Sequence, residues 1–240
     1  MVLRIFRRRL ESQLNNAQSY IYYSISPHRH CERSAANQSH VLIFHAYLAI
    51  DGIYNHVMPI ITKIETERLI LRSWKDEDAA VFAAINQDPH VIEFLRGAMT
   101  LQESQDFITR TNQFIAKNGF GLWAATIKES DELIGFVGLH IPDFESHFTP
   151  CVEIGWRLGF KYWGNGYAVE AAKASLKSGF ENFGLKEIVA ITTEKNIRSI
   201  SVMKKIGMKR DLNGDFSHPK LPLDHANSKH VLYRISAPKK

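Results

Sequence analysis

The sequence predicts a single α/β domain, of α+β type, on a mixed and largely antiparallel sheet, behind an N-terminal segment of different character. Three observations predict this fold class. Strand-like and helix-like segments follow one another in the order β-α-α-β-β-β-α-β-α-β-β, and no internal repeat is present. The composition, 45% hydrophobic and 23% charged residues in 240, is ordinary for a globular protein.

The domain begins with a predicted strand and two predicted helices. Apolar and polar residues alternate at 65–74, which is typical of a half-buried strand. Asp76 is expected to cap the helix that follows. The second helix is expected at 101–118, because Thr100 is a favourable N-terminal cap and Gly119 a favourable stop. Its apolar residues fall on one face: Phe107, Ile108, Phe114 and Ile115.

Six further strands and two further helices are predicted after this point. The strands are short apolar runs bounded by turn residues, at 120–130, 132–141, 151–159, 187–193, 208–216 and 229–236. Asp131 marks the turn of a hairpin between the first two of these strands. The helices are expected at 168–183 and at 197–206, the second with Asn196 as its cap.

Residues 1–57 differ from the rest of the chain. They show no sustained helical or strand period, and six arginines against three acidic residues give them +3 of the total charge of +5. We interpret them as a poorly structured extension and residues 58–240 as the folded domain. The phrase PHRHCERSAANQSH resembles translated bacterial repeat DNA, which makes Met58 a candidate natural start; an arginine-rich targeting peptide is the alternative.

Charge and cysteine content exclude several function classes. The body of the chain carries only the remaining +2, whereas nucleic-acid binding demands a concentrated basic face. No apolar run approaches the roughly 20 residues that span a bilayer. Cys31 and Cys151 provide neither a disulfide framework nor metal-ligand spacing, which favours a reducing, cytoplasmic compartment. We therefore expect no nucleic-acid partner and no membrane.

The candidate ligand-binding loop is Gly164-Asn165-Gly166, between a predicted strand and a predicted helix. The P-loop pattern is absent, and a dinucleotide fingerprint fails because its third small residue would be Val169. Backbone N–H groups in the first turn of a helix lack internal partners and lie at the positive end of its dipole. A pyrophosphate is favoured there if small residues let it approach. Taken alone, two glycines also suit an ordinary strand-to-helix turn.

The run EIGWRLGFKYWGNGYAVEA, followed by NIRSISVMKKIGM, resembles the GNAT superfamily of N-acetyltransferases. It is most similar to the ribosomal-protein-alanine N-acetyltransferase-like (RimJ/RimL type) branch. The superfamily's loop, Q/R-x-x-G-x-G/A, falls on 163–168, with Trp163 in place of Gln or Arg. Asn196 and Ser199 match a second motif, N-x-x-S-x-x-V-x-x-x-x-G-F/M. The resemblance covers about residues 62–236.

The resemblance implies a GNAT-type sheet with helices on both faces and a split between two central strands, here 151–158 and 187–193. Acetyl-CoA would lie in this split as the cosubstrate. Main-chain groups of one strand would bond its pantetheine arm: those of Trp156, Arg157 and Leu158. The pyrophosphate would lie on the amides of the glycine turn: those of Gly164, Asn165, Gly166, Tyr167 and Ala168. Asn196 and Ser199 would contact the cofactor near its thioester.

The reaction that the resemblance implies is direct attack of an amine on the thioester carbonyl. At pH 7 a lysine-like amine needs about 4.6 kcal/mol for deprotonation and an α-amine about 1.4 kcal/mol, so only the former demands a strong base. Glu153 and His140 are the candidate bases, and Ser199 is a candidate proton donor for the departing thiolate. Each also has a structural interpretation: an ion-paired strand carboxylate, a loop-edge histidine and a helix-surface serine.

The sequence thus predicts a cytoplasmic acetyl-CoA-dependent N-acetyltransferase, monomeric or homodimeric, that needs no metal. Its acceptor is either a peptide or protein N-terminal amine or a small amine. The acceptor pocket is expected from 86–119, 140–150 and 212–230, and the histidines of the last segment match no zinc spacing. The alternative is a non-catalytic acyl-CoA-binding or regulatory domain that keeps the loop but lacks a competent base.

Overall fold

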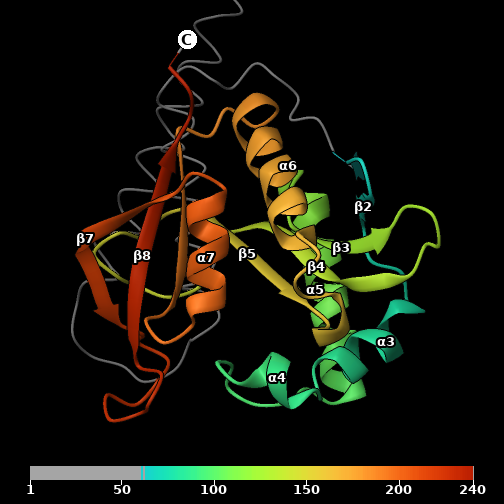
Figure 1. Cartoon of the computed structure of the whole chain (residues 1–240), viewed down its shortest axis with the longest axis horizontal. Helices are drawn as coiled ribbons and strands as arrows, with labels where there is room; N and C mark the ends of the chain where they lie inside the picture. Colours follow the sequence, from blue (N-terminus) through green and yellow to red (C-terminus); the bar gives the residue numbers. More distant parts are fainter. Residues whose placement is uncertain (1–60, 62, 240) are drawn as a thin grey trace, which may run out of the picture. The chain divides into compact units, whose positions relative to one another are not determined.

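The computed structural model describes residue 61 and residues 63–239, so the predicted 1–57 extension and the Met58 start lie outside the described residues. The described part of the chain forms one sheet of eight strands in the order β1-β2-β3-β4-β5-β6-β8-β7. All neighbouring strands are antiparallel except β5 and β6, which are parallel. The predicted mixed, largely antiparallel sheet and the α/β class are confirmed (Figure 1).

The elements have the following bounds. The strands are β1 (Lys63–Glu65), β2 (Leu69–Arg72), β3 (Leu122–Ile127), β4 (Leu133–His140), β5 (Glu153–Leu158), β6 (Glu187–Thr193), β7 (Lys209–Ser217) and β8 (Lys229–Ser236). The helices are α3 (Asp78–Ile85), α4 (Pro89–Ile92), α5 (Leu101–Asn118), α6 (Tyr167–Glu181) and α7 (Ile197–Lys205), with a 3-10 turn, η1 (Phe160–Tyr162).

Helix α5 has the predicted bounds because its end signals are local. The Thr100 hydroxyl accepts from the Glu103 N–H at 3.2 Å, and the Glu103 carboxylate accepts from the Thr100 N–H at 2.7 Å. Gly119 ends the helix at a φ of 78°, which glycine adopts readily. On the predicted face, Ile108 and Ile115 are buried and the two phenylalanines are half-buried.

Two predictions near the start of the domain are wrong. The segment 65–74 is not one strand, because Thr66 and Leu69 bond each other across a tight turn that separates β1 from β2. Asp76 is not a side-chain cap: Glu77 stands at the cap position of α3 without a side-chain bond. The carboxylate of Asp78 instead accepts from the Lys75 N–H at 2.8 Å, from inside the first turn.

The short helix α4 was not expected from the sequence. It begins at Pro89, which suits a first helical position, and the Asp88 carboxylate accepts from the His90 N–H at 2.8 Å. The sequence therefore contained a pattern that marks the start of a helix, an Asp cap followed by proline. A four-residue helix leaves too little periodicity to detect it.

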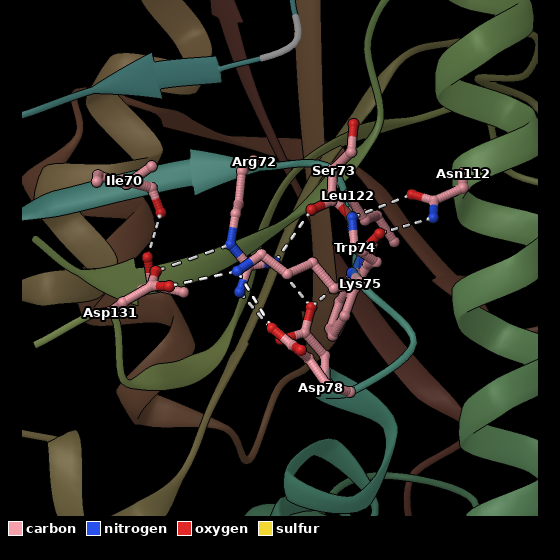
Figure 2. Close-up of polar contacts among 11 residues, drawn as sticks. Ile70, Arg72, Ser73, Trp74, Lys75, Asp78, Asn112, Leu122 and Asp131 are labelled. Atoms are coloured by element: carbon pink, nitrogen blue, oxygen red, sulfur yellow. Dashed lines mark hydrogen bonds and ion pairs between the residues drawn. The ribbon is translucent and has the colours of Figure 1, made fainter.

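A set of paired polar groups fastens α3 and α5 to one face of the sheet (Figure 2). Arg72 donates to both carboxylate oxygens of Asp78, at 2.7 and 3.0 Å. The main chain of Trp74 exchanges two bonds with the Asn112 amide, and its indole N–H donates to the Leu122 carbonyl at 2.7 Å. Apolar residues on this face pack into one cluster: Trp74, Phe82, Ile108 and Phe136.

Helix α6 packs on the opposite face, against β4 and β5 (Figure 1). A Cβ on Gly179 would lie 2.8 Å from Ile188 and 3.0 Å from Leu139, so the helix approaches the sheet closely at this point. Helix α7 packs against β6. Helices therefore cover both faces, and the centre of the sheet lies between α5 and α6.

The sheet is split between β5 and β6. These strands form a single register pair, Glu153 with Val189, next to a bond of 2.9 Å from the Val189 N–H to the Val152 carbonyl. No further register pair joins the two strands in the described part of the chain, so they diverge toward Leu158. The predicted split is confirmed, and it opens toward the glycine turn.

Candidate active site

A first cavity of about 490 Å³ lies where β5 ends, beside the glycine turn and α7. Nine of the residues predicted for acetyl-CoA border it: Trp156, Arg157, Leu158, Gly164, Gly166, Tyr167, Ala168, Asn196 and Ser199. Asn165 does not line this cavity. Its side-chain amide instead donates to the Tyr162 and Trp163 carbonyls at 3.2 Å, which closes the turn.

The glycine turn presents unpaired backbone N–H groups to the first cavity. Gly164 and Gly166 have φ values of 80° and 81°, in the left-handed region that favours glycine. Among the described residues, the first N–H after Trp163 to find a protein acceptor is that of Glu170, which donates to the Gly166 carbonyl at 3.0 Å. Six consecutive N–H groups, at 164–169, are therefore left for a ligand or solvent, and all but that of Asn165 belong to residues that line the first cavity.

Contacts outside the turn hold it in place. The Arg68 guanidinium donates to the Asn165 carbonyl at 3.0 Å and to the Glu170 carboxylate at 2.7 Å. The Trp163 indole N–H donates to the Leu158 carbonyl at 2.8 Å, which ties the turn to the end of β5. Sequence reasoning missed this role, although a half-buried tryptophan N–H usually finds an acceptor.

The main chain of β5 is open on its β6 side at Trp156. Gly159 donates to Ile134 of β4 at 2.9 Å, so by strand alternation the main chain of Arg157 also faces β4, and that of Trp156 and Leu158 faces the split. The Leu158 carbonyl is already bonded by Trp163. Both main-chain groups of Trp156 and the N–H of Leu158 thus face the split, whereas Arg157, also expected there, borders it with its side chain.

A second cavity of about 750 Å³ adjoins the first, on the α5 face of the sheet. It draws on the three segments expected for an acceptor pocket, since Phe114, His140 and Lys220 are among its lining residues. Four of the predicted site residues border both cavities: Trp156, Arg157, Asn196 and Ser199. The structure therefore brings all three predicted catalytic residues, Glu153, His140 and Ser199, to one cavity wall.

Glu153 and His140 face each other as register partners of β5 and β4. The His140 Nε2 atom lies 3.5 Å from a Glu153 carboxylate oxygen, and the Glu153 side chain is only 11% exposed. Burial raises the pKa of Glu153 to about 8 and lowers the pKa of His140 to about 4. Both groups are thus mostly uncharged at pH 7. The structural reading of Glu153 as an ion-paired carboxylate does not fit this environment.

Two residues that line the second cavity each have a buried polar atom without a hydrogen-bond partner among the described residues, His140 Nδ1 and Thr193 Oγ1. Buried polar atoms are rarely left unpaired, and they are found where a ligand or water completes the bonding. Thr193 was not expected at the site, because its position at the end of a regular strand carries no distinguishing pattern.

Asn196 and Ser199 sit at the start of α7. The Asn196 side-chain oxygen accepts from the Ser199 N–H at 3.1 Å, as the cap of this helix. The Asn196 NH₂ group and the Ser199 hydroxyl remain at the junction of the two cavities. These are the groups that could contact a ligand there.

The Arg157 side chain is a feature that the sequence did not single out. Its Nη1 atom donates to the Asn86 side-chain oxygen at 2.6 Å, and its guanidinium lies 5.5 Å from the Phe136 ring centre. Burial lowers its pKa to about 10. A basic residue in a strand ordinarily indicates a solvated position, so only the packing of α3 against the sheet reveals this burial.

Within residues 63–239, no group of three or more His, Cys, Asp or Glu side chains gathers in a way that could hold a metal ion. No helix in the described part of the chain is both long and apolar enough to cross a membrane.

Comparison with known proteins identifies one family model, the acetyltransferase (GNAT) domain, over residues 68–209. The chain is 32% identical over 148 residues to the uncharacterized protein YkkB of Bacillus subtilis, covering 61% of this chain and 85% of that protein. It is 32% identical over 149 residues to the uncharacterized N-acetyltransferase YnaD of the same species, covering 62% and 83%. A crystal structure of a GNAT-family acetyltransferase from Bacillus anthracis superposes with a TM-score of 0.60 at 28% identity, covering 72% of this chain and 98% of that one.

Proposed function

The chain belongs to the GNAT family of acetyltransferase domains, and we propose that it transfers an acetyl group from acetyl-CoA directly to an amine in a ternary complex. Membership makes it an acetyl-CoA-dependent acyltransferase. The observation that carries the proposal is the junction of the two cavities at Trp156, Arg157, Asn196 and Ser199. A thioester in the first cavity and an amine in the second can meet there without a covalent enzyme intermediate.

The first cavity suits the donor. The six free N–H groups at 164–169, at the N-terminus of α6, favour a pyrophosphate by hydrogen bonding and by the helix dipole. The open main chain of Trp156 suits the pantetheine arm, which would bond to β5 in place of the missing part of β6. On the donor side the protein supplies its hydrogen bonds from backbone groups. The presence of Trp163 instead of Gln or Arg at the first position of the loop motif therefore leaves these bonds unchanged.

The second cavity suits the acceptor and its deprotonation. Glu153 is the proposed general base, because a carboxylate whose pKa is about 8 holds a proton strongly at working pH. The amine nitrogen forms a bond to the acetyl carbon, its proton passes to Glu153 directly or through water, and the carbon–sulfur bond breaks. The Ser199 hydroxyl, at the junction, is the proposed proton donor for the CoA thiolate, and it regains a proton from solvent at the same time.

The acceptor is a small amine or a peptide N-terminal amine, and the ribosomal-protein-alanine branch stays a prediction. The cytoplasmic location and the monomeric or homodimeric state also stay predictions. The rival function, a binding or regulatory domain, is favoured by one observation: Glu153 is largely protonated at pH 7, where a base should be ionised.

The loop assignment is tested by replacing the two glycines at opposite ends of α6. Gly166 and Gly184 both have positive φ, 81° and 63°, so an alanine at either position introduces similar backbone strain. Gly166→Ala should weaken acetyl-CoA binding at least tenfold by calorimetry, whereas Gly184→Ala should leave it unchanged. Equal affinities for the two variants would remove the phosphate-loop assignment.

Transfer itself is tested by release of free CoA from acetyl-CoA in the presence of a broad panel of amines that includes N-terminal peptides. We expect at least one amine to release CoA well above the hydrolysis rate. If the wild-type chain binds acetyl-CoA but no amine accelerates thiol release, the binding-domain function replaces the transferase.

A further inference from the structure

The second cavity carries an excess of positive charge that no carboxylate of the described residues neutralises. Four cationic side chains line it (Arg96, Arg110, Arg157 and Lys220), against two carboxyl groups (Asp143 and Glu153). Lys220 forms an ion pair with Asp143. Glu153 is mostly uncharged at pH 7, because burial raises its pKa to about 8. The three arginines are therefore in excess.

Arg157 is the most confined of these cations. Its Nη1 atom contacts the Asn86 oxygen at 2.6 Å and the Met99 sulfur at 3.4 Å, and neither partner is charged. No carboxylate of the described residues pairs with it. A guanidinium has five N–H donors, and those on Nε and Nη2 have no partner among the described residues. Arg157 is half-buried, so solvent in the cavity can reach these free donors, and a bound anion would replace that solvent as their partner.

The position of Arg157 indicates which ligand would neutralise it. It borders both cavities, at the junction where thioester and amine would meet. Arg96 and Arg110 border the second cavity and not the first, and Arg110 makes no ion pair with any described residue. By contrast, Arg198 beside the first cavity is paired with Glu93. The arginines without a carboxylate partner among the described residues thus all border the second cavity, whereas the first cavity has Lys205 as a further cation.

We infer that the second cavity selects a small amine that carries its own carboxylate within a few bonds of the nitrogen, namely an α-amino acid, and that Arg157 holds this carboxylate. The inference rests on the proposed function, since it names the acceptor class of the same site. A guanidinium matches a carboxylate with two parallel hydrogen bonds, which fixes the orientation of the neighbouring amine. Arg96 and Arg110 draw the anion into the cavity. A peptide N-terminus has no carboxylate next to its amine, so the inference separates the two acceptors.

The test compares twenty L-amino acids with their α-amides, using the full chain. Binding is measured by calorimetry in the presence of CoA, where no transfer can occur, and turnover is measured as CoA released from acetyl-CoA. We expect at least one amino acid to bind tenfold more tightly than its amide and to show a correspondingly higher kcat/KM. If no amino acid exceeds its amide in binding, the inference is overturned, with or without turnover.

Substitution of Arg157 assigns the preference to this side chain. Arg157→Met should raise KM for the preferred amino acid at least tenfold, change kcat less, and raise KM for the corresponding amide much less. Arg157→Lys should give an intermediate KM, because it keeps the charge and loses the planar pair of donors. The matched control is Arg210→Met, an exposed arginine of β7 that pairs with Asp215 and lines neither cavity. If Arg157→Met does not fold, the KM of Arg157→Lys for the preferred amino acid provides the test. An unchanged KM in Arg157→Lys would show that Arg157 does not hold the carboxylate.

A carboxylate could also arrive on the acyl group of the donor. Succinyl-CoA and acetyl-CoA binding to the wild type and to Arg157→Met separates these sources. We expect the substitution to weaken the binding of the amino acid and not that of succinyl-CoA. If it weakens only the binding of succinyl-CoA, Arg157 holds a carboxylate of the donor, and the inference is overturned. The proposed acetyl transfer can be disproved separately from the amino acid site. If amino acids bind more tightly than their amides but no CoA is released, the amino acid site is supported and the transferase function is rejected.

Discussion

Two groups of ionisable side chains lie against the same helix-covered face of the sheet, and they differ in how their charges are satisfied. We call Arg72 and Asp78 the paired cluster and Glu153, His140 and Arg157 the unpaired cluster. In the paired cluster two hydrogen bonds of 2.7 and 3.0 Å join opposite charges (Figure 2). In the unpaired cluster His140 Nε2 lies 3.5 Å from the Glu153 carboxyl group, and among the described residues Arg157 donates only to neutral atoms.

The difference shows how ionisable residues that stabilise the fold can be told apart from those that serve the active site. Pairing compensates the desolvation of Arg72 and Asp78, and their bonds join β2 to the start of α3. The unpaired cluster lines the second cavity, and burial shifts the pKa values of its three members away from their ordinary values. Such shifts cluster at functional sites. We therefore expect the paired cluster to control stability and the unpaired cluster to control activity.

The largest effect is expected from breaking the paired cluster. Among the described residues, Asp78→Asn leaves the Arg72 guanidinium with only its longer ion pair to Asp131, at 4.0 Å, which should lower the free energy of unfolding by about 3 kcal/mol. Urea unfolding at pH 7 measures this loss. Asp76→Asn, two residues earlier and exposed, should change stability by less than about 0.5 kcal/mol. Similar values for the two variants would show that the pair contributes little.

The second effect concerns activity. Glu153→Gln removes the proposed base while keeping the shape of the side chain, so kcat for the best amine should fall about 100-fold or more. The affinity for acetyl-CoA and the stability at pH 6 should stay near those of the wild type, because Glu153 is mostly uncharged there. Undiminished kcat across pH 6–9 would remove Glu153 as the base.

The third effect is a pH dependence of stability. Burial raises the pKa of Glu153 to about 8, above its value in the unfolded chain, so the folded state retains a proton that the unfolded state loses and stability falls as pH rises toward 8. The lowered pKa values of His140 and His218 act in the opposite direction below pH 6.5. Between pH 6.5 and 8 the contribution of Glu153 to the free energy of unfolding should therefore fall by about 1.6 kcal/mol, and the difference between the wild type and Glu153→Gln separates it from the contribution of the histidines.

Glu153→Gln provides the control for this slope. Urea unfolding at several pH values should show the fall in the wild type and its absence in the variant. Parallel curves for the two proteins would mean that Glu153 titrates at its ordinary pKa and belongs with solvated carboxylates.

The smallest effect tests a paired group beside the site. Trp163 donates its indole N–H to the Leu158 carbonyl, so Trp163→Phe should lower the free energy of unfolding by about 1 kcal/mol. With the best amine, kcat should change by less than about twofold, because the group is bonded to protein. A large loss of kcat with unchanged stability would contradict the distinction between paired and unpaired groups.

The sequence by itself determined the features whose causes lie within a few residues. The capping box of Thr100, the stop at Gly119, the cap at Asn196 and the glycine turn at 164–166 are all local. Each depends on backbone groups that the same short segment supplies. The predictions that failed, the single strand at 65–74 and the Asp76 cap, concern places where a local pattern had two solutions and tertiary contacts selected one.

Only the tertiary structure decided which side chains are buried together and which lack partners. Arg157 meets Asn86 across 71 residues of chain, and His140 meets Glu153 only through the register of β4 and β5. No local pattern encodes such contacts, because they arise when α3 and β4 pack against β5. The sequence thus identified the loop for the donor, whereas the charge of the acceptor cavity depends on desolvation, which exists only once the chain has folded.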